Sequence, residues 1–410
     1  MSLEPKTLDE QSWRARYMRT ANNLKQCVVD APIALCLSNA CVDAVCRLMD
    51  LDKAVTSSSP SGARDLFDKL QRRAIAGRGG ELRCTWKGGP EWLRERLSLN
   101  RSIGGTGPQA AAALAAIGVP NLVALGNRNE VLLSTLPANV NIAVGNKLFE
   151  GRHVEPTTSQ MPEIFIFEFS AGETIAGTAL PRSSRVIVRF DDPGLERDPE
   201  FDTYSNKIAG NAAALIGGLG SVPSHRIDAE LSYLKGLVET WRTNGLRWLH
   251  LELGGYEDKA TLDAVLKAVG GIATSLGMSA SEFPDVAYGR TATPEHMVEV
   301  AQQLGVERLC VHADDWASSV TRRSAETETE ALITGSLLSA VRAAHGTVVS
   351  EVKVPEKSRF TETPYTSSRL EGEWNYISVA TPYLIQPVAT IGLGDTFSAG
   401  CILVLGQEKV

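Results

Sequence analysis

The feature that most constrains the fold is a regular alternation of helical and extended patterns along the second half of the chain. Apolar residues recur at helical spacing in several segments, and short apolar runs separate them. The expected helices and strands are helix 228–244, strand 246–253, helix 259–269, helix 294–304, strand 307–312 and helix 327–343. Alternating helices and buried strands form a doubly wound α/β sheet with helices on both faces, a three-layer αβα sandwich.

A second sequence pattern predicts a smaller, sheet-based domain. Residues 57–100 combine a polar helix, a glycine turn and a short strand at 81–86 whose residues alternate in polarity. Such alternation suits a sheet with one face open, as in a lid. We expect residues 162–169 and 184–190 to supply further strands of this lid. A length of 410 residues accommodates one large domain and one smaller domain.

Charge and composition argue against several classes of partner. The formal net charge of -7 disfavours a nucleic-acid partner. The chain has no apolar run of eighteen residues, and residues 1–20 are polar, so we expect neither a membrane span nor a signal peptide. The seven cysteines are odd in number and form no C-x-x-C pair, which favours reduced thiols in a cytoplasmic protein.

The glycine-rich stretch at 391–400 predicts an anion site beside a carboxylate. Its sequence is I-G-L-G-D-T-F-S-A-G, in which two glycines allow a tight turn before a helix. A carboxylate would repel a phosphate that it merely faced. Asp395 is therefore interpreted as a base that takes a proton from a hydroxyl attacking that phosphate. The alternative is an aspartate that caps a helix after a glycine turn.

Polar residues also follow the first apolar run, residues 31–37. Asn39 and Asp43 come after this run, and we place them at the C-terminal edge of the predicted strand, where α/β sheets bind ligands. The alternative is a turn residue and a helix cap.

Two further motifs carry candidate binding residues. Gly104 and Gly105 precede an alanine-rich helix, and their lack of side chains lets backbone amides approach a ligand. His250 and Glu252 lie two apart on a predicted strand, so both point to the same face. A carboxylate at the strand's end suits Mg²⁺, which takes one or two protein carboxylates and several waters. A surface His/Glu pair is the alternative.

Together these motifs resemble the ADP-dependent glucokinase and phosphofructokinase family of the ribokinase-like superfamily. The resemblance rests on G-x-G-D at 392–395, on H-x-E at 250–252, on I-F-E-F at 166–169, and on the Asn39 and Gly104 segments. It implies a ribokinase-like fold and a Mg²⁺-dependent kinase of glycolysis. The reaction implied is transfer of a phosphoryl group from ADP to a hexose or hexose phosphate, with a sugar and a nucleotide as partners.

The resemblance also implies roles for the candidate residues. Asp395 would be the catalytic base, Gly392, Leu393 and Gly394 the anion hole around the nucleotide phosphate, and Glu252 the magnesium carboxylate. Sugar contacts would come from Asp43, Asn39, Glu81, Gly104 and Gly105. The domain division that we expect is large domain 1–50, lid 51–102, large domain 103–148, lid 149–198 and large domain 199–410.

Departures from the family pattern leave alternatives open. The loop Gly105-Thr106-Gly107-Pro108 is closer to ribokinase than to the family's usual G-G-[QN]-A-G, so an ATP-dependent ribokinase-type kinase is the second interpretation. A catalytically silent sugar-binding or regulatory protein is the third. Glu81 favours glucose over fructose 6-phosphate as the sugar, because a carboxylate accepts hydrogen bonds from sugar hydroxyls and repels a phosphate group. Against it stands a basic cluster that could hold the phosphate of fructose 6-phosphate, namely Arg182, Arg185 and Arg189.

Overall fold

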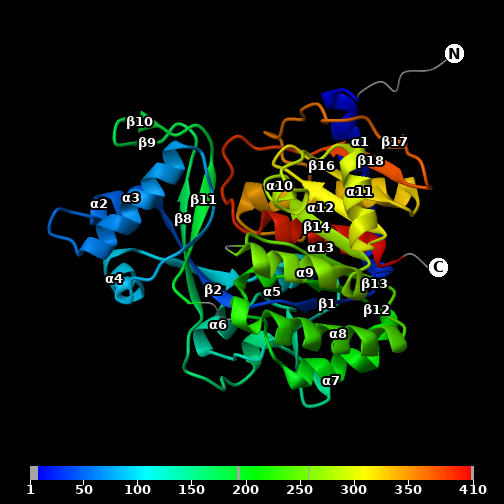
Figure 1. Cartoon of the computed structure of the whole chain (residues 1–410), viewed down its shortest axis with the longest axis horizontal. Helices are drawn as coiled ribbons and strands as arrows, with labels where there is room; N and C mark the ends of the chain where they lie inside the picture. The colour runs from blue at the N-terminus through cyan, green and yellow to red at the C-terminus, as the bar shows by residue number, and fades with distance from the viewer. Residues whose placement is uncertain (1–7, 192–193, 257, 408–410) are drawn as a thin grey trace.

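The computed structural model describes residues 8–191, 194–256 and 258–407, which form a larger and a smaller part, each built on its own sheet (Figure 1). The α-helices are α1 (Glu10–Val29), α2 (Leu48–Ala54), α3 (Ser61–Ile75), α4 (Gly89–Arg96), α5 (Thr106–Ala116), α6 (Glu130–Thr135), α7 (Pro199–Ile208), α8 (Ile227–Thr243), α9 (Lys259–Ile272), α10 (Phe283–Val286), α11 (Pro294–Leu304), α12 (Ala325–His345) and α13 (Leu393–Leu405). Short 3₁₀ helices are η1 (Gly151–His153), η2 (Ala209–Asn211), η3 (Leu219–Ser221) and η4 (Ser224–Arg226).

The strands divide between these two sheets and two small hairpins. In chain order they are β1 (Ile33–Leu37), β2 (Cys41–Arg47), β3 (Gly80–Arg83), β4 (Asn100–Gly104), β5 (Asn121–Val123), β6 (Asn141–Val144), β7 (Lys147–Glu150), β8 (Glu163–Phe169), β9 (Thr174–Ile175), β10 (Thr178–Ala179), β11 (Ser184–Arg189), β12 (Ala212–Ile216), β13 (Trp248–Glu252), β14 (Ser275–Ser279), β15 (Arg308–His312), β16 (Trp316–Thr321), β17 (Ser368–Arg369) and β18 (Asn375–Ala380). The hairpins are β6–β7 and β9–β10.

The larger sheet has nine strands in the order β17-β18-β16-β15-β14-β13-β12-β1-β5. The strands from β15 to β5 are parallel, whereas β16, β18 and β17 are antiparallel to their neighbours. Since a parallel strand is covered on both faces, apolar side chains point to both sides of it. In β13, Trp248 belongs to the core that includes residues of α1, α5, α12 and α13, while Leu249 and Leu251 belong to the core that includes residues of α7, α8, α9 and α11.

The smaller sheet has five strands in the order β3-β11-β8-β2-β4, and α2, α3 and α4 share a core with one of its faces. Phe165 and Phe167 of β8 pack with Leu66 and Leu70 of α3 in the covered core. The intervening residues Ile164 and Ile166 point to the opposite face, because side chains alternate along a strand. This open face is turned toward the larger sheet (Figure 1).

The predicted fold class is confirmed, since helices cover both faces of the larger sheet and a smaller sheet lies beside it. The predicted helices of the second half correspond to α8, α9, α11 and α12. Strands β12, β14, β16 and β18 were not predicted. The expected division assigned residues 41–47 to the large domain, whereas β2 pairs with β4 and β8 in the smaller sheet.

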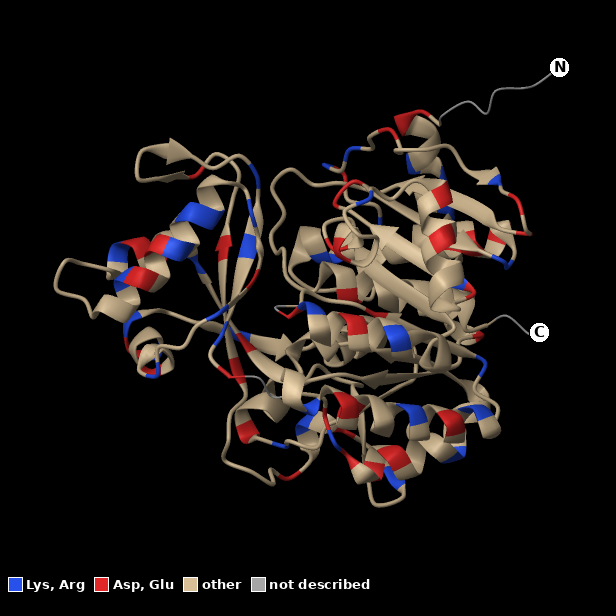
Figure 2. Cartoon of the chain, in the orientation of Figure 1, with Lys and Arg blue, Asp and Glu red and all other residues tan. Residues whose placement is uncertain are grey.

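The helices of both parts carry charged residues of both signs. Acidic and basic residues are interspersed along the helices of both parts (Figure 2). None of the helices in the described ranges is both long enough and apolar enough to cross a membrane.

Helices α12 and α13 approach each other closely through two glycines. A Cβ atom on Gly335 would lie 2.5 Å from the carbonyl oxygen of Phe397, and one on Gly400 would lie 2.6 Å from the Cα of Gly335. Both distances are below any ordinary contact, so the backbones themselves form the interface. This contact holds α13, whose first turn forms one wall of the site, against the core.

This packing predicts opposite effects for two Gly→Ala changes. Gly335→Ala should lower the free energy of unfolding by about 1–3 kcal/mol, because the added methyl overpacks the α12–α13 contact. Gly236→Ala is the matched control, since Gly236 is exposed in α8 and its Cβ would meet nothing within 4 Å. It should stabilise by about 0.5–1 kcal/mol through helix propensity. Thermal and urea unfolding measure both, and equal effects would contradict the close approach.

Candidate active site

A cavity of about 910 Å³ lies between the carboxyl ends of the parallel strands and the open face of the smaller sheet. The smaller sheet contributes Asp43, Glu81 and Arg185, and the larger part contributes Glu252 and Asp395. Ligands of open α/β sheets bind at this edge, so the cavity is the candidate active site.

The glycine turn before α13 forms one wall of the cavity. Gly392 has a φ of 71°, in the left-handed region that favours glycine. A Cβ atom there would also lie 2.6 Å from the Cζ of Arg342, so the turn packs directly on a guanidinium. The Nε of Arg342 donates to the carbonyl oxygen of Ile391 (3.0 Å), and its Nη1 donates to the hydroxyl of Thr396 (3.3 Å). Arg342 therefore holds both sides of the turn.

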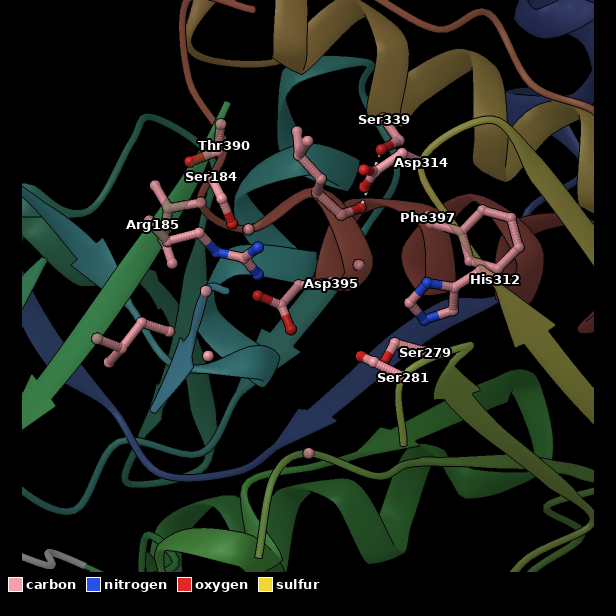
Figure 3. Close-up of a pocket in the computed structure, with 18 of the residues that line it drawn as sticks. Ser184, Arg185, Ser279, Ser281, His312, Asp314, Ser339, Thr390, Asp395 and Phe397 are labelled. Atoms are coloured by element: carbon pink, nitrogen blue, oxygen red, sulfur yellow. Dashed lines mark hydrogen bonds between the residues drawn. The ribbon is translucent and has the colours of Figure 1, made fainter. Parts of the chain in front are cut away.

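The first turn of α13 presents backbone N–H groups that have no acceptor within the helix. The carbonyl of Leu393 accepts a hydrogen bond from Ser339 of α12 (3.1 Å), which fixes the start of the helix (Figure 3). Gly394 follows, and it lines the cavity with Gly392 and Leu393. The first turn thus has the backbone character of an anion site.

Asp395 lies in the cavity wall within this first turn, and the guanidinium of Arg185 points toward it from the smaller sheet (Figure 3). Desolvation raises the pKa of Asp395 above its ordinary value, while the charge of Arg342 and a hydrogen bond from Thr106 oppose that rise. A raised pKa makes the carboxylate a better proton acceptor. The geometry therefore combines an anion site with a base.

Asp43 lies in β2 rather than at the end of β1, which corrects the predicted placement. Its carboxylate nevertheless faces the cavity and accepts a hydrogen bond from the side-chain amide of Gln109 (3.0 Å). The carbonyl oxygen of that amide accepts from Arg342. Desolvation raises the pKa of Asp43 to about 7 against the opposing charge of Arg342. Gln109 thereby connects Asp43 to the arginine beneath the glycine turn.

The predicted glycine loop packs against the strand ends that carry Asn39 and Asp43. A Cβ on Gly104 would overlap the Asp43 carboxylate, and a Cβ on Gly105, whose φ is 92°, would overlap the carbonyl oxygen of Asn39. Only glycine fits both places. The structure therefore brings Asn39, Asp43 and Gly105 together on one wall of the cavity.

Glu252 ends β13 and is almost completely enclosed by hydrogen-bond donors. Its Oε2 is 2.9 Å from His250 Nε2 and accepts from the hydroxyl of Ser398 (2.8 Å), while its Oε1 is 3.0 Å from His312 Nε2. The shared face predicted for His250 and Glu252 is thus confirmed. Burial alone would raise the pKa of Glu252, but the bonds from His250 and His312 outweigh it and lower that pKa to about 2. Glu252 is therefore a fixed negative charge at the cavity.

These residues fit Mg²⁺ only with most of its water shell. A carboxylate has about four acceptor positions, and donors already occupy three on Glu252. Glu282 also lines the cavity, and desolvation raises its pKa, with the charge of Glu252 adding to that rise. Within the described ranges, no three or more His, Cys, Asp or Glu side chains gather into a metal-binding group. The donor set suits an ion bound largely through water and phosphate oxygens.

The smaller sheet brings both signs of charge to the cavity. Glu81 forms an ion pair with the nearly buried Arg189 (2.9 Å). The third member of the predicted basic cluster, Arg182, pairs with Asp314 across the cavity (2.6 Å). The cluster is therefore divided among separate acidic partners, and Arg185 is the member that points toward Asp395 (Figure 3).

Sequence reasoning missed several residues of the site: Gln109, Glu282, His312 and Arg342. A usable signal existed for Arg342 alone, since an arginine between apolar residues on the buried side of a helix needs a partner.

Comparison with known proteins gives this chain a family. Residues 34–404 match the family model described as the ADP-specific phosphofructokinase/glucokinase conserved region. The ADP-dependent glucose/glucosamine kinase of Pyrococcus furiosus is 22% identical over 58% of this chain and 60% of its own length. The ADP-specific phosphofructokinase of Thermococcus litoralis is 28% identical over 57% of this chain and 61% of its own length. The chain thus spans about three fifths of the length of these curated relatives.

Solved structures show the same fold over nearly the whole chain. An ADP-dependent kinase in complex with fructose-6-phosphate and ADPbetaS has a TM-score of 0.80 and 18% identity, covering 98% of this chain and 99% of its own. The last common ancestor of ADP-dependent phosphofructokinases from Methanosarcinales has a TM-score of 0.71 at 18% identity, covering 98% of this chain and all of its own.

The environment of Asp43 predicts a pH dependence of stability. Its folded-state pKa of about 7 lies above the ordinary 3.8, so the native protein keeps a proton that the unfolded chain releases. This group therefore lowers stability as pH rises from about 4 to 7 and adds no further change above that. Asp43→Asn should reduce the loss of Tm between pH 5 and pH 8 by roughly 2 °C or more. Thermal unfolding at both pH values tests this, and an unchanged difference would contradict the assigned pKa.

Proposed function

Because the chain belongs to the ADP-specific phosphofructokinase/glucokinase family, we propose that it is a sugar kinase that uses ADP. In the proposed reaction the β-phosphoryl group of ADP passes to a hydroxyl of a hexose or hexose phosphate, and AMP leaves. The observation that carries the proposal is the position of Asp395. Its carboxylate stands in one cavity with the glycine turn on its own helix and with Asp43 on the facing sheet.

Asp395 serves as the general base in this mechanism. Phosphoryl transfer depends mainly on positioning and charge neutralisation, so the protein must hold the attacking hydroxyl in line and accept its proton. Desolvation raises the pKa of Asp395, which favours proton acceptance, while Arg342 and Arg185 keep the charged form accessible. The proton of the sugar hydroxyl moves to a carboxylate oxygen as the bond to phosphorus forms.

The transferred phosphoryl group is held by the first turn of α13 and by the guanidinium of Arg185 on the facing sheet. Backbone N–H groups at Gly392, Leu393 and Gly394 bind the phosphoryl oxygens, and the guanidinium of Arg185 adds a positive charge. Glu252 and Glu282, which both line the cavity, would hold Mg²⁺. When bound, that ion neutralises charge on the phosphate oxygens.

The sugar is placed between the smaller sheet and the glycine loop. Asp43 accepts hydrogen bonds from the sugar hydroxyls, and the side-chain amide of Asn39 donates to them. Gly105 allows the ring to approach the backbone, while Gly104, which does not line the cavity, makes room for the Asp43 carboxylate. The smaller sheet with α2, α3 and α4 acts as the lid, and the remainder of the chain carries the nucleotide site.

We also place the enzyme in the cytoplasm, since all seven cysteines are free thiols.

A donor and acceptor assay tests the proposal directly. Purified protein is incubated with Mg²⁺, ADP or ATP, and a set of sugars that includes glucose and fructose 6-phosphate. The proposed function requires a sugar phosphate and an equal amount of AMP with ADP as donor. Turnover with ATP and release of ADP would instead establish an ATP-dependent kinase, and binding without turnover of any pair would establish a silent sugar-binding protein.

The role of Asp395 predicts a large and selective loss of rate. Asp395→Asn should lower kcat by about 10² or more with little change in sugar binding, as removal of a general base does. Asp9→Asn is the matched control, because Asp9 caps α1 and does not line the cavity. It should keep the full rate. Steady-state kinetics and calorimetry with sugar give the two readouts, and near-full activity of Asp395→Asn would exclude its role as base.

The ion pair between Glu81 and Arg189 bears on the choice of sugar. A carboxylate at this place accepts hydrogen bonds from an unphosphorylated sugar, and it balances a guanidinium that would otherwise attract a sugar phosphate. We therefore favour glucose over fructose 6-phosphate as the acceptor.

Glu81→Ala tests this preference. It should raise the KM for glucose about tenfold or more and improve the relative use of fructose 6-phosphate, because Arg189 loses its carboxylate. Glu91→Ala, an exposed change in α4 outside the cavity, is the control and should alter neither. Unchanged glucose kinetics in Glu81→Ala would remove Glu81 from the sugar site and the preference with it.

A further inference from the structure

The smaller sheet reaches across the cavity and touches the segment that leads into the glycine turn. Glu168 lies on the open face of β8 and is only 7% exposed. Its Oε1 accepts two hydrogen bonds, one from the backbone N–H of Thr390 and one from the Thr390 hydroxyl, each at 2.9 Å. Thr390 stands two residues before Gly392. A buried carboxylate in one part thus depends on donors in the other.

The next residue is held by both parts at once. The side chain of Ile391 packs against Ile164 and Ile166 on the open face of the smaller sheet. Its carbonyl oxygen accepts from Arg342 in the larger part. The two residues before Gly392 are therefore fixed from the smaller sheet by a charge-assisted contact and an apolar contact, while the turn itself rests on α12.

Other contacts between the two parts differ in kind. Arg182 and Asp314 form an ion pair whose side chains are 50% and 58% exposed, so water and salt screen it. Ser183 donates to the carbonyl of Ile385 in an exposed loop (3.2 Å). Neither touches the residues next to Gly392. The buried Asp43 of the smaller sheet reaches the turn indirectly, through Gln109 and Arg342. Glu168, by contrast, bonds directly to Thr390 in the segment that leads into the turn.

We propose that Glu168 is a positioning residue that sets the Gly392 turn when the smaller sheet lies against residues 390–391. This inference rests on the proposed function. Movement of the sheet away from the segment removes both donors from Glu168 and uncovers Ile391, so the turn keeps only the support from α12, through Arg342 and Ser339. Because Asp43 lies on the same sheet, sugar bound there stabilises the arrangement in which the anion site is complete. ADP without sugar meets a turn with less support, which restrains attack by water.

Variants of the contact test the proposal. Glu168→Gln keeps the shape and loses the charge, Thr390→Val removes one donor, and Glu163→Gln is the control. Glu163 lies on the same strand, where it pairs with Arg94 (2.6 Å) and Arg101 (3.1 Å) within the smaller part and outside the cavity. Glu168→Gln should lower kcat on the order of tenfold, since charge-assisted bonds are about twice as strong as neutral ones. Glu163→Gln should leave kcat as in the wild type.

The decisive readout is the linkage between the two ligands. Calorimetry with a chelator in place of Mg²⁺, so that no transfer occurs, gives the Kd of ADP, which carries the phosphate that the turn holds. The linkage ratio is the Kd of ADP alone divided by its Kd with saturating glucose or fructose 6-phosphate. The ratio should exceed one for the wild type and Glu163→Gln and fall toward one for Glu168→Gln. The double variant with Thr390→Val should lose less than the sum of the single losses. A merely structural role would lower Tm and leave the ratio unchanged.

The outcomes separate this inference from the proposed function. Unchanged kcat and linkage in Glu168→Gln, or equal losses in Glu163→Gln, would overturn the positioning role while the wild type remains a kinase. A wild type that transfers no phosphoryl group to any sugar would overturn the proposed function. In that case the ligand linkage alone decides the role of Glu168, because it needs binding and no turnover.

Discussion

The site depends on one buried guanidinium. Arg342 is only 8% exposed, and it donates to the carbonyl of Ile391, the hydroxyl of Thr396 and the side chain of Gln109. A buried charge is tolerated only when its donors are satisfied and opposite charge is near, and here Asp395 and Asp43 supply the opposite charge through space. The planar fork of arginine reaches three acceptors in different directions, which a lysine ammonium on a flexible stem does not reproduce.

The carboxylates of the cavity owe their different protonation behaviour to their surroundings. Burial would raise the pKa of Glu252, but His250 and His312 lower it to about 2. For Asp43, burial raises the pKa to about 7 against the charge of Arg342. Asp395 is raised by the same desolvation. One cavity thus provides a permanent anion and two groups that accept protons more readily. Because the pKa values differ, Glu252 stays charged beside a cation while Asp395, in the same cavity, can accept a proton.

Local patterns in the sequence predicted much of this structure. The glycine turn, the glycine loop and the His250/Glu252 pair were found because each is a short motif whose chemistry lies in consecutive residues. Arg342, Gln109 and His312 were missed because their roles come from contacts far apart in the chain. Strands β12 and β14 were missed because their alanine, serine and glycine residues have low strand propensity and are extended only through pairing with neighbours. Asp43 was misplaced because the chain leaves β1 and enters the other sheet within three residues.

That short crossing has a mechanical consequence. The backbone passes between the two sheets at residues 38–40, and it returns at Gly105, between β4 and α5. The chain crosses again between β7 and β8 and between β11 and α7, so Asn39 and Gly105 lie on two of the connections between the parts and also line the cavity. A change of backbone conformation at Asn39 or Gly105 therefore alters the orientation of the smaller sheet and the shape of the cavity wall at the same time, without intermediate residues.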